Sequence, residues 1–297
     1  MSIPQSGGGP IEHPEQMAAY LAAGCKPESK WRIGTEHEKF GFCQANQSPL
    51  PYSGPCSIKT ILEALRDRFG WSPVLEADKL IGLTRNGANI SLEPGGQFEL
   101  SGAPLETIHD TANELNQHLD ELRGISDEIG AGFIALGAAP IWSHETMPVM
   151  PKGRYTLMTD YMDRVGTMGK FMMYRTSCVQ VNLDFSSEAD MVQKMRVAVA
   201  LQPIATALFA NSPFFDGLPN GIKVGAAAFG KILMQIVQAC CPSYLSRGLA
   251  LRLGSNTPSM CQCILSTETA DILMLWVNLS AIFYRENCPP CPQSGPA

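Results

Sequence analysis

Apolar residues along this chain alternate between the spacing of a helix and that of a strand. Between Ser57 and Phe69 they follow one helical face, and Ser57 can cap the first turn while Gly70 can end the last. A longer helix is predicted over residues 105–130, because leucine and isoleucine recur there every three or four positions. Residues 132–139 follow it as a predicted buried strand.

Two further helices complete the pattern. Residues 11–21 have helical spacing, and Ser187 with Asp190 can cap a helix that Pro203 is expected to kink or break. Single strands separated by long helices predict an α+β fold, with helices packed on one face of a mainly antiparallel sheet.

Acidic and amide side chains occur two residues apart in three strand-like runs. Residues two apart in a strand share a face, so each run presents one polar face. If these faces converge inside a curved sheet, they form an oxygen-rich cup that Mg²⁺ or Mn²⁺ would stabilise. We expect such a cup to hold a nucleoside triphosphate. The paired residues are Glu36 with Glu38, Gln97 with Glu99, and Gln180 with Asn182.

A solvated strand face is the simpler interpretation of any one of these pairs, but three such runs in one chain favour the cup. His37 lies by period on the face opposite to Glu36 and Glu38, so we expect it to be a structural, hydrogen-bonded histidine. The turn from Glu93 to Gln97 contains two glycines, which permit positive φ and the close approach of a ligand.

Two arginines are candidates for contacts with an anionic substrate. Arg154 follows a Pro-Lys-Gly turn, and Arg175 precedes the third polar run. Arginine binds carboxylate and phosphate groups through two parallel hydrogen bonds. The alternative is that both are surface arginines whose aliphatic stems are buried. Acidic strands together with arginines suggest ATP-dependent activation of a carboxylate.

Composition narrows the class of protein. The chain has 297 residues, of which 45% are hydrophobic, enough for one large domain or two modest ones. A formal net charge of −6 argues against non-specific nucleic-acid binding, which depends on lysine and arginine. Residues 1–10 have the features of neither a signal nor a transit peptide, so we expect a cytoplasmic protein. Apolar runs fall short of the roughly 18 residues that span a bilayer, so we expect no membrane contact.

Five stretches of the chain resemble glutamate-cysteine ligase of the plant and proteobacterial type. The resemblance runs without interruption from about residue 11 to Gly221. One local departure is the order of Ser177 and Cys178, because the family usually has cysteine followed by threonine here. The stretches are Trp31–Phe42, Ile90–Glu106, Met150–Tyr155, Val179–Phe185 and Ala200–Pro213.

The resemblance implies a function and a set of site residues. It implies a glutamine-synthetase-like curved sheet that binds ATP and Mg²⁺, with Mn²⁺ as a substitute. The implied reaction joins L-glutamate, activated as γ-glutamyl phosphate, to L-cysteine, giving γ-glutamylcysteine in the first step of glutathione biosynthesis. The implied residues are the metal ligands Glu36, Glu38, Glu93 and Glu99, the catalytic arginines Arg154 and Arg175, and the cofactor contacts Gln97, Lys152, Gln180 and Asn182.

Residues 222–297 depart from the family, which continues after Gly221 with a Trp/Arg-rich segment. Back-translating this part of the chain and reading it two bases out of frame permits a continuous family-like sequence. We therefore hypothesise a frameshift just after Gly221. The predicted organisation is a disordered segment 1–10, a partial catalytic domain 11–221 and an aberrant, poorly ordered tail 222–297.

Two alternatives to an active ligase remain. One is another ATP-dependent carboxylate-amine ligase that uses the same cup with a different amine. The other is a non-catalytic, truncated remnant. Cys288 and Cys291 in the tail do not favour zinc, because two prolines separate them and no second pair follows at metal-binding spacing.

Overall fold

The computed structural model describes residues 12–165 and 168–221, so the predicted segments 1–10 and 222–297 lie outside the described residues. Within the described part, seven strands join in one sheet in which every pairing is antiparallel. The strands are β1 (Ile33–Cys43), β2 (Ser72–Glu76), β3 (Lys79–Arg85), β4 (Ala88–Leu92), β5 (Phe98–Ser101), β6 (Ala131–Ile134) and β7 (Val179–Leu183).

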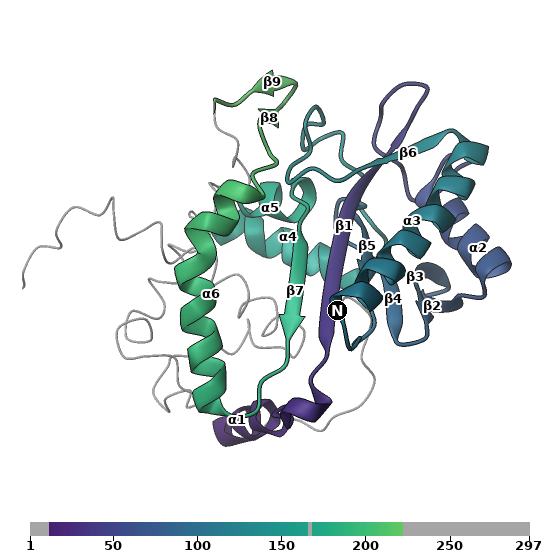
Figure 1. Cartoon of the computed structure of the whole chain (residues 1–297). Coiled ribbons are helices and arrows are strands. Elements are labelled where there is room, and N and C mark those ends of the chain that lie inside the picture. The colour runs from purple at the N-terminus through teal and green to yellow at the C-terminus, as the bar shows by residue number, and fades with distance from the viewer. Residues whose placement is uncertain (1–11, 166–167, 222–297) are drawn as a thin grey trace, which may run out of the picture.

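The long strand β1 organises the sheet (Figure 1). The strand order is β2-β3-β4-β5-β1-β6, and β7 also pairs with β1. Residues 36–39 of β1 pair with β5, residues 33–37 pair with β7, and residues 40–43 pair with β6. The register places Glu36 between Ser101 of β5 and Gln180 of β7, so the polar runs of the sequence become neighbours.

Helices flank this sheet, and a two-stranded ribbon follows the last of them (Figure 1). A short 3₁₀ turn, Glu28–Lys30, leads into β1. The helices are α1 (Pro14–Ala23), α2 (Ile58–Phe69), α3 (Ile108–Ile129), α4 (Gly153–Val165), α5 (Gly169–Arg175) and α6 (Glu188–Leu208), and the ribbon is β8 (Phe214–Phe215) with β9 (Leu218–Pro219).

Helices α2 and α3 lie side by side over one face of the sheet (Figure 1). Their apolar residues and those of β3, β4 and β5 form one buried core, and each such side chain contributes about 1.5–3 kcal/mol when fully buried. The α+β class and the mainly antiparallel sheet are therefore confirmed. Core members from both layers include Ile61, Leu62, Leu65, Leu122, Ile125, Leu83, Ile90 and Phe98.

The caps of the two core helices follow the sequence signals. Ser57 Oγ accepts a hydrogen bond from the Thr60 amide at 3.3 Å, and Gly70 ends α2 at φ 72°. Thr107 caps α3, and Gly130 ends it at φ 69°. Positive φ is the conformation in which glycine is favoured over residues with a Cβ atom.

One predicted boundary is wrong, and a break that was one of two expected outcomes is absent. The strand expected over residues 132–139 is shorter, because only Ala131–Ile134 pairs with β1. Helix α6 continues through Pro203 to Leu208. Pro203 is exposed, so the carbonyl group that loses its amide donor can be hydrated by water.

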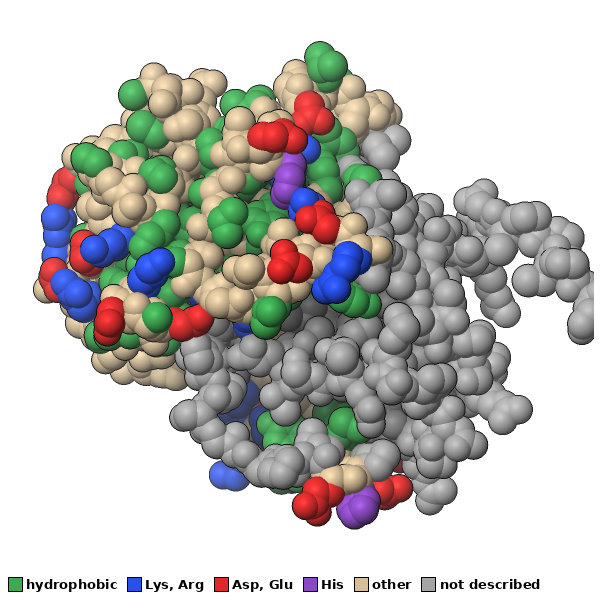
Figure 2. Space-filling model, turned by 180° about the vertical axis from the view of Figure 1, so that it is seen from behind, with side chains coloured by type: hydrophobic (Ala, Val, Ile, Leu, Met, Phe, Trp, Pro, Cys, Tyr) green, Lys and Arg blue, Asp and Glu red, His purple; other side chains and the backbone are tan. Residues whose placement is uncertain are grey.

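The surface of the described part mixes charges of both signs. Seen from behind, acidic and basic side chains lie interspersed with apolar ones rather than grouped by sign (Figure 2). In the part of the chain that the structure describes, no helix is long and apolar enough to cross a membrane.

Candidate functional site

Successive side chains of β1 point to opposite faces of the sheet, which gives two sets of side chains. Lys39 Nζ lies 3.1 Å from Nε2 of His118 on α3 and donates to the carbonyl oxygen of Phe98 at 3.2 Å. Burial, with Lys39 nearby, lowers the pKa of His37, which places His37 on the same side. Glu36 and Glu38 therefore point to the other face, as predicted from alternation.

On this other face the register aligns polar residues into two rows across the strands. Residues directly opposite in antiparallel strands have Cβ atoms about 4.5–5.5 Å apart. The carboxylate row consists of Ser91, Glu99 and Glu38, and the amide row consists of Asn89, Ser101, Glu36 and Gln180.

Glu99 is the most enclosed carboxylate of the two rows, with 4% of its surface exposed. Ser91 Oγ donates to its Oε2 at 2.6 Å, and Ser101 Oγ donates to its Oε1 at 2.7 Å. Hydrogen bonds to a charged acceptor are about twice as strong as neutral ones, so the serines hold Glu99 in place. Sequence reasoning missed both serines, although polar residues alternate in β4 and β5 as they do in β1.

The surroundings of Glu38 disfavour the charged form of its carboxyl group. Desolvation raises its pKa well above the ordinary value, and the neighbouring carboxylates of Glu93 and Glu99 raise it further. The Cys178 amide donates to Glu38 Oε2 at 3.1 Å, and the Cys178 thiol donates to Oε1 at 3.3 Å. We call Glu38, Glu93 and Glu99 the carboxylate trio, because the charges of Glu93 and Glu99 both act on Glu38.

Glu93 is positioned by a tight turn between β4 and β5. Its amide donates to the Gln97 carbonyl at 3.0 Å, and its carbonyl accepts from the Gly96 amide at 2.9 Å. Gly96 has φ 80°, and a Cβ atom on Gly95 would lie 2.2 Å from the carbonyl oxygen of Tyr174. Both glycines of the turn are therefore required by its geometry.

Gln97 holds a structural position in the turn, and its predicted contact with a cofactor stays a prediction. Its Oε1 accepts from the Gly95 amide at 2.9 Å, and its Nε2 donates to the carbonyls of Met173 at 3.1 Å and Thr176 at 2.7 Å. The side chain is buried, and its donors and acceptor already have partners. Gln97 thus fastens the turn to α5.

Lys152 and Arg154 bring positive charge to the same end of the sheet. Lys152 Nζ is buried and donates to the Leu92 carbonyl at 2.9 Å. Burial lowers the pKa of Lys152 to about 8, while Glu93 and Glu99 act in the opposite direction. The Arg154 guanidinium lies 5.0 Å from the Tyr155 ring centroid, and its Nη2 donates to the Tyr155 hydroxyl at 3.2 Å.

The remaining polar residues of β1 and β7 lie next to the trio. Asn182 Nδ2 donates to Glu36 Oε1 at 2.9 Å. Gln180 Nε2 donates to the Cys178 sulfur at 3.3 Å, and the Cys178 thiol in turn donates to Glu38, so Gln180 is linked to the trio through Cys178.

Arg175 is directed to a different partner from the one predicted. Its Nη2 donates to Oδ1 of Asp216 at 2.6 Å, and its guanidinium lies 4.4 Å from the Phe171 ring centroid. Asp216 lies between β8 and β9, so this ion pair ties α5 to the ribbon. In this geometry Arg175 forms an ion pair, and its catalytic role stays a prediction.

The trio has the donor chemistry of a hard-cation site, since Mg²⁺ and Mn²⁺ prefer carboxylate and amide oxygens. On the same face, Asn89 Oδ1 is buried without a hydrogen-bond partner among the described residues. The side chains are too far apart to form a ready metal site. In residues 12–165 and 168–221, no three histidine, cysteine, aspartate or glutamate side chains are grouped closely enough to hold one metal ion. The predicted four-glutamate ligand set is thus not assembled, and a cation would have to draw the carboxylates together.

Fold and site define an α+β protein that gathers carboxylates on the face of an antiparallel sheet opposite α2 and α3. A family model described as glutamate-cysteine ligase family 2 matches residues 32–223. The chain therefore belongs to this ligase family, as the sequence motifs predicted.

Curated relatives support the same assignment. The chain is 57% identical over 207 residues to the chloroplastic glutamate–cysteine ligase of Brassica juncea, a match that covers 70% of this chain and 40% of the relative. It is 57% identical over the same length to the Arabidopsis thaliana enzyme and 55% identical to enzyme A of Oryza sativa subsp. japonica. The chain thus spans about 40% of the length of these relatives.

The names of these relatives correct one expectation. Each of the three is a chloroplastic enzyme, so the cytoplasmic assignment made from the amino-terminal composition is wrong. Composition of a short terminal segment was a weak basis for that assignment.

Proposed function

We propose that this chain carries the carboxylate-lined part of an ATP- and Mg²⁺-dependent glutamate–cysteine ligase. The proposed reaction phosphorylates the γ-carboxylate of L-glutamate and then joins it to the amine of L-cysteine, giving γ-glutamylcysteine for glutathione biosynthesis. The raised pKa of Glu38 beside Glu93 and Glu99 is the observation that carries the proposal. Mutual repulsion of buried carboxylates is relieved most directly by a bound cation.

The carboxylate trio would hold the cation. Glu99 is fixed by its two serine hydroxyls, so Glu38 and Glu93 are the side chains that would move toward the ion. Glu36, with Asn182 beside it, stands in the next row as a further oxygen donor. When bound, the cation would neutralise charge that develops on the transferring phosphoryl group.

The positive side chains at the start of α4 would orient the anionic reactants. The charge of Glu93 affects the pKa of Lys152, and the charges of Glu93 and Arg154 both affect the pKa of Tyr155. Lys152 and Arg154 therefore lie near Glu93, where they would contact a phosphate held by the trio. A guanidinium suits bidentate contact with a carboxylate or phosphate, whereas the ammonium of Lys152 acts as a point charge. The chain would thus contribute positioning and charge complementarity rather than a covalent step.

The direct test is formation of γ-glutamylcysteine by the purified chain with Mg²⁺, ATP, L-glutamate and L-cysteine. We expect the product to depend on Mg²⁺ and to fall by at least tenfold in Glu38→Gln. If other amines stimulate ATP hydrolysis as strongly as cysteine does, the result would instead favour the alternative carboxylate-amine ligase.

We also propose that residues 222–297 are out of frame with the family. Support comes from the family match, which ends at residue 223, and from the relatives, of whose length only about 40% is matched. Under the non-catalytic alternative, the purified chain would form no product, because the remaining family sequence would be lost. Resequencing the locus tests this, and assaying the polypeptide read through in the shifted frame separates a lost activity from a wrong assignment. A clean read of the present tail with an active protein would contradict the frameshift.

A further inference from the structure

A buried tyrosine lies between the two positive side chains at the start of α4. Tyr155 has 1% of its surface exposed, and Lys152 and Arg154 precede it in the chain. The Lys152 ammonium lies 5.4 Å from the centroid of the Tyr155 ring, and the Arg154 guanidinium lies 5.0 Å from it. An aromatic ring attracts cations over its face, so Tyr155 gathers both positive charges around itself.

The Tyr155 hydroxyl holds the peptide group that leads into Glu93. It donates to the carbonyl oxygen of Leu92, which also accepts from Lys152 Nζ at 2.9 Å. Two side chains thus hold the same oxygen. The carbonyl of Leu92 and the nitrogen of Glu93 belong to one planar peptide unit, so holding this oxygen also restrains the backbone of Glu93.

The same hydroxyl group is also bonded to Arg154. The hydroxyl proton is directed to Leu92, so its oxygen acts as the acceptor for Arg154 Nη2 at 3.2 Å. Neighbouring residues of a helix do not face each other, so Arg154 reaches this oxygen by folding its side chain back over the Tyr155 ring. The hydroxyl therefore links the guanidinium of Arg154 to the backbone at Glu93.

Burial keeps this hydroxyl in its neutral form. Desolvation raises the pKa of Tyr155 well above its ordinary value, and the negative charge of Glu93 raises it further, while Arg154 acts in the opposite direction. A neutral phenol can donate one hydrogen bond and accept another, whereas a phenolate can only accept. Tyr155 thus makes both contacts at neutral pH.

We propose that Tyr155 is a positioning residue for phosphate binding, which holds the guanidinium of Arg154 at a fixed distance from the carboxylate of Glu93. The inference rests on the proposed function, in which the trio binds the cation and Arg154 contacts the phosphate. A phosphate that bridges a cation and a guanidinium needs both at once, so fixing their separation beforehand lowers the entropic cost of binding. Tyr155 is buried and acts on the phosphate through Arg154.

A double-mutant cycle on the full chain tests this role. The probe is the preformed complex of Mg²⁺ with inorganic tripolyphosphate, titrated by isothermal calorimetry, because its binding requires the trio and the two positive side chains but no nucleoside. Tyr155→Phe removes only the hydroxyl and should weaken probe binding by about tenfold, as should Arg154→Gln. In the Arg154→Gln chain, Tyr155→Phe should weaken probe binding by less than about twofold, because the hydroxyl acts through the guanidinium.

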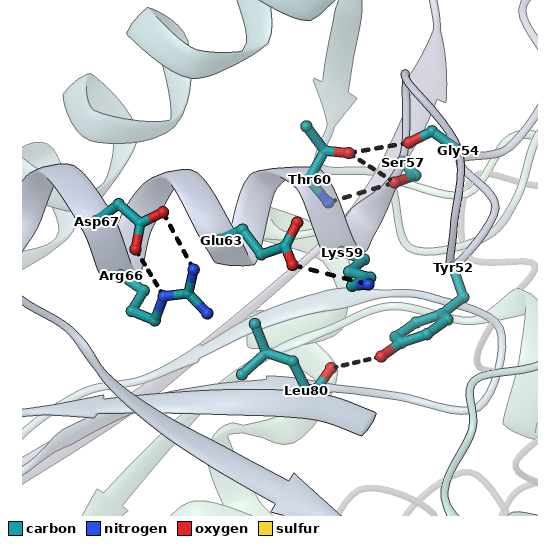
Figure 3. A network of polar contacts seen from close by, with 9 residues as sticks. All are labelled: Tyr52, Gly54, Ser57, Lys59, Thr60, Glu63, Arg66, Asp67 and Leu80. Atoms are coloured by element: carbon teal, nitrogen blue, oxygen red, sulfur yellow. Dashed lines mark hydrogen bonds and ion pairs between the residues drawn. The ribbon is translucent and has the colours of Figure 1, made fainter. Parts of the chain in front are cut away.

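Two residues near the start of α2 provide matched controls (Figure 3). The Tyr52 hydroxyl also donates to a main-chain carbonyl, that of Leu80, at 3.1 Å. Tyr52→Phe therefore removes an equivalent hydrogen bond and should leave probe binding unchanged. Lys59 pairs with Glu63 on α2, so Lys59→Gln removes a positive charge outside the site and should also leave probe binding unchanged.

Mn²⁺ binding shows whether each variant keeps a folded site. Tyr155→Phe should bind Mn²⁺ within about twofold of the wild type, because Lys152 still holds the Leu92 carbonyl. Loss of Mn²⁺ binding in Tyr155→Phe would make Tyr155 a structural residue and overturn the proposal, as would additive losses of probe binding in the double mutant. A wild-type chain that does not bind the probe would instead contradict the proposed function, and the inference would fall with it.

Discussion

The two faces of the central sheet are built from alternate residues of the same strands, yet they obey different physical rules. Phe98 points into the core beneath α2 and α3, and its ring lies 5.5 Å from that of Phe133. Its neighbour Glu99 points to the opposite face, where two serine hydroxyls hold its carboxylate. One face is stabilised by burial, whereas the other collects like charges that oppose one another. The difference shows that like charges on the polar face oppose folding, which supports the proposed role of this face in binding a cation.

The largest loss of stability is expected from a substitution in the apolar face. Phe98→Ala should lower the free energy of unfolding by about 3–5 kcal/mol, because it removes a fully buried ring and leaves a cavity. Urea unfolding followed by circular dichroism measures this change. Phe69→Ala, at an exposed position at the end of α2, should cost much less, and equal losses would contradict the contrast.

Removing either serine that donates a hydrogen bond to Glu99 should have the next largest effect. Ser91→Ala and Ser101→Ala each delete a hydrogen bond to a buried carboxylate, which should cost about 1–3 kcal/mol of unfolding free energy. The exposed Ser72 of β2 provides a matched control, with a loss below about 0.5 kcal/mol expected for Ser72→Ala. Losses of control size at all three positions would mean that the serines do not hold Glu99.

The pH dependence of stability sharpens the comparison, because Glu38 opposes folding when it is ionised. A carboxyl group whose folded pKa is raised stabilises the fold at low pH, and this stabilisation is lost as the pH rises through that pKa. In the presence of a chelator, Glu38→Gln should therefore gain stability relative to the wild type between pH 5 and pH 8. Chemical unfolding at both values measures the gain, and a difference that does not change with pH would contradict it.

The smallest effect is expected at the solvent-exposed surface of α3. Arg123 pairs with Asp120 at 2.7 Å, and both side chains are mostly exposed. Arg123→Ala should change the free energy of unfolding by less than about 0.5 kcal/mol, since water and salt screen such pairs. A thermal melt measures the change in stability. If Arg123→Ala destabilised the protein as much as Ser91→Ala does, the predicted order of effects would be wrong.

Local sequence signals predicted much of the fold. Ser57 with Gly70, and the apolar period leading to Gly130, located α2 and α3, because caps and helical faces are properties of neighbouring residues. Pro203 misled the prediction of α6, since an exposed helix face tolerates the lost hydrogen bond. The strand after Gly130 is shorter than predicted, because its length is set by pairing with β1. Sequence spacing alone does not reveal that pairing.

The candidate site was predictable where alternation decides the direction of a side chain. Glu36 and Glu38 share a face for this reason, and the register then brings Glu99 opposite Glu38. The contacts of Gln97 with Thr176 and of Arg175 with Asp216 were not predicted, because they join segments that are far apart in sequence. Long-range pairing of this kind requires the three-dimensional structure.

The central claim is that the carboxylate trio binds a divalent cation. Titration of the chain with Mn²⁺, followed by electron paramagnetic resonance of the free ion, tests it most directly. Glu38→Gln and Glu99→Gln should each weaken Mn²⁺ binding by at least tenfold. Glu128→Gln, at an exposed position of α3, should leave Mn²⁺ binding unchanged. Equal Mn²⁺ binding by all four proteins, or none by the folded wild type, would contradict the claim.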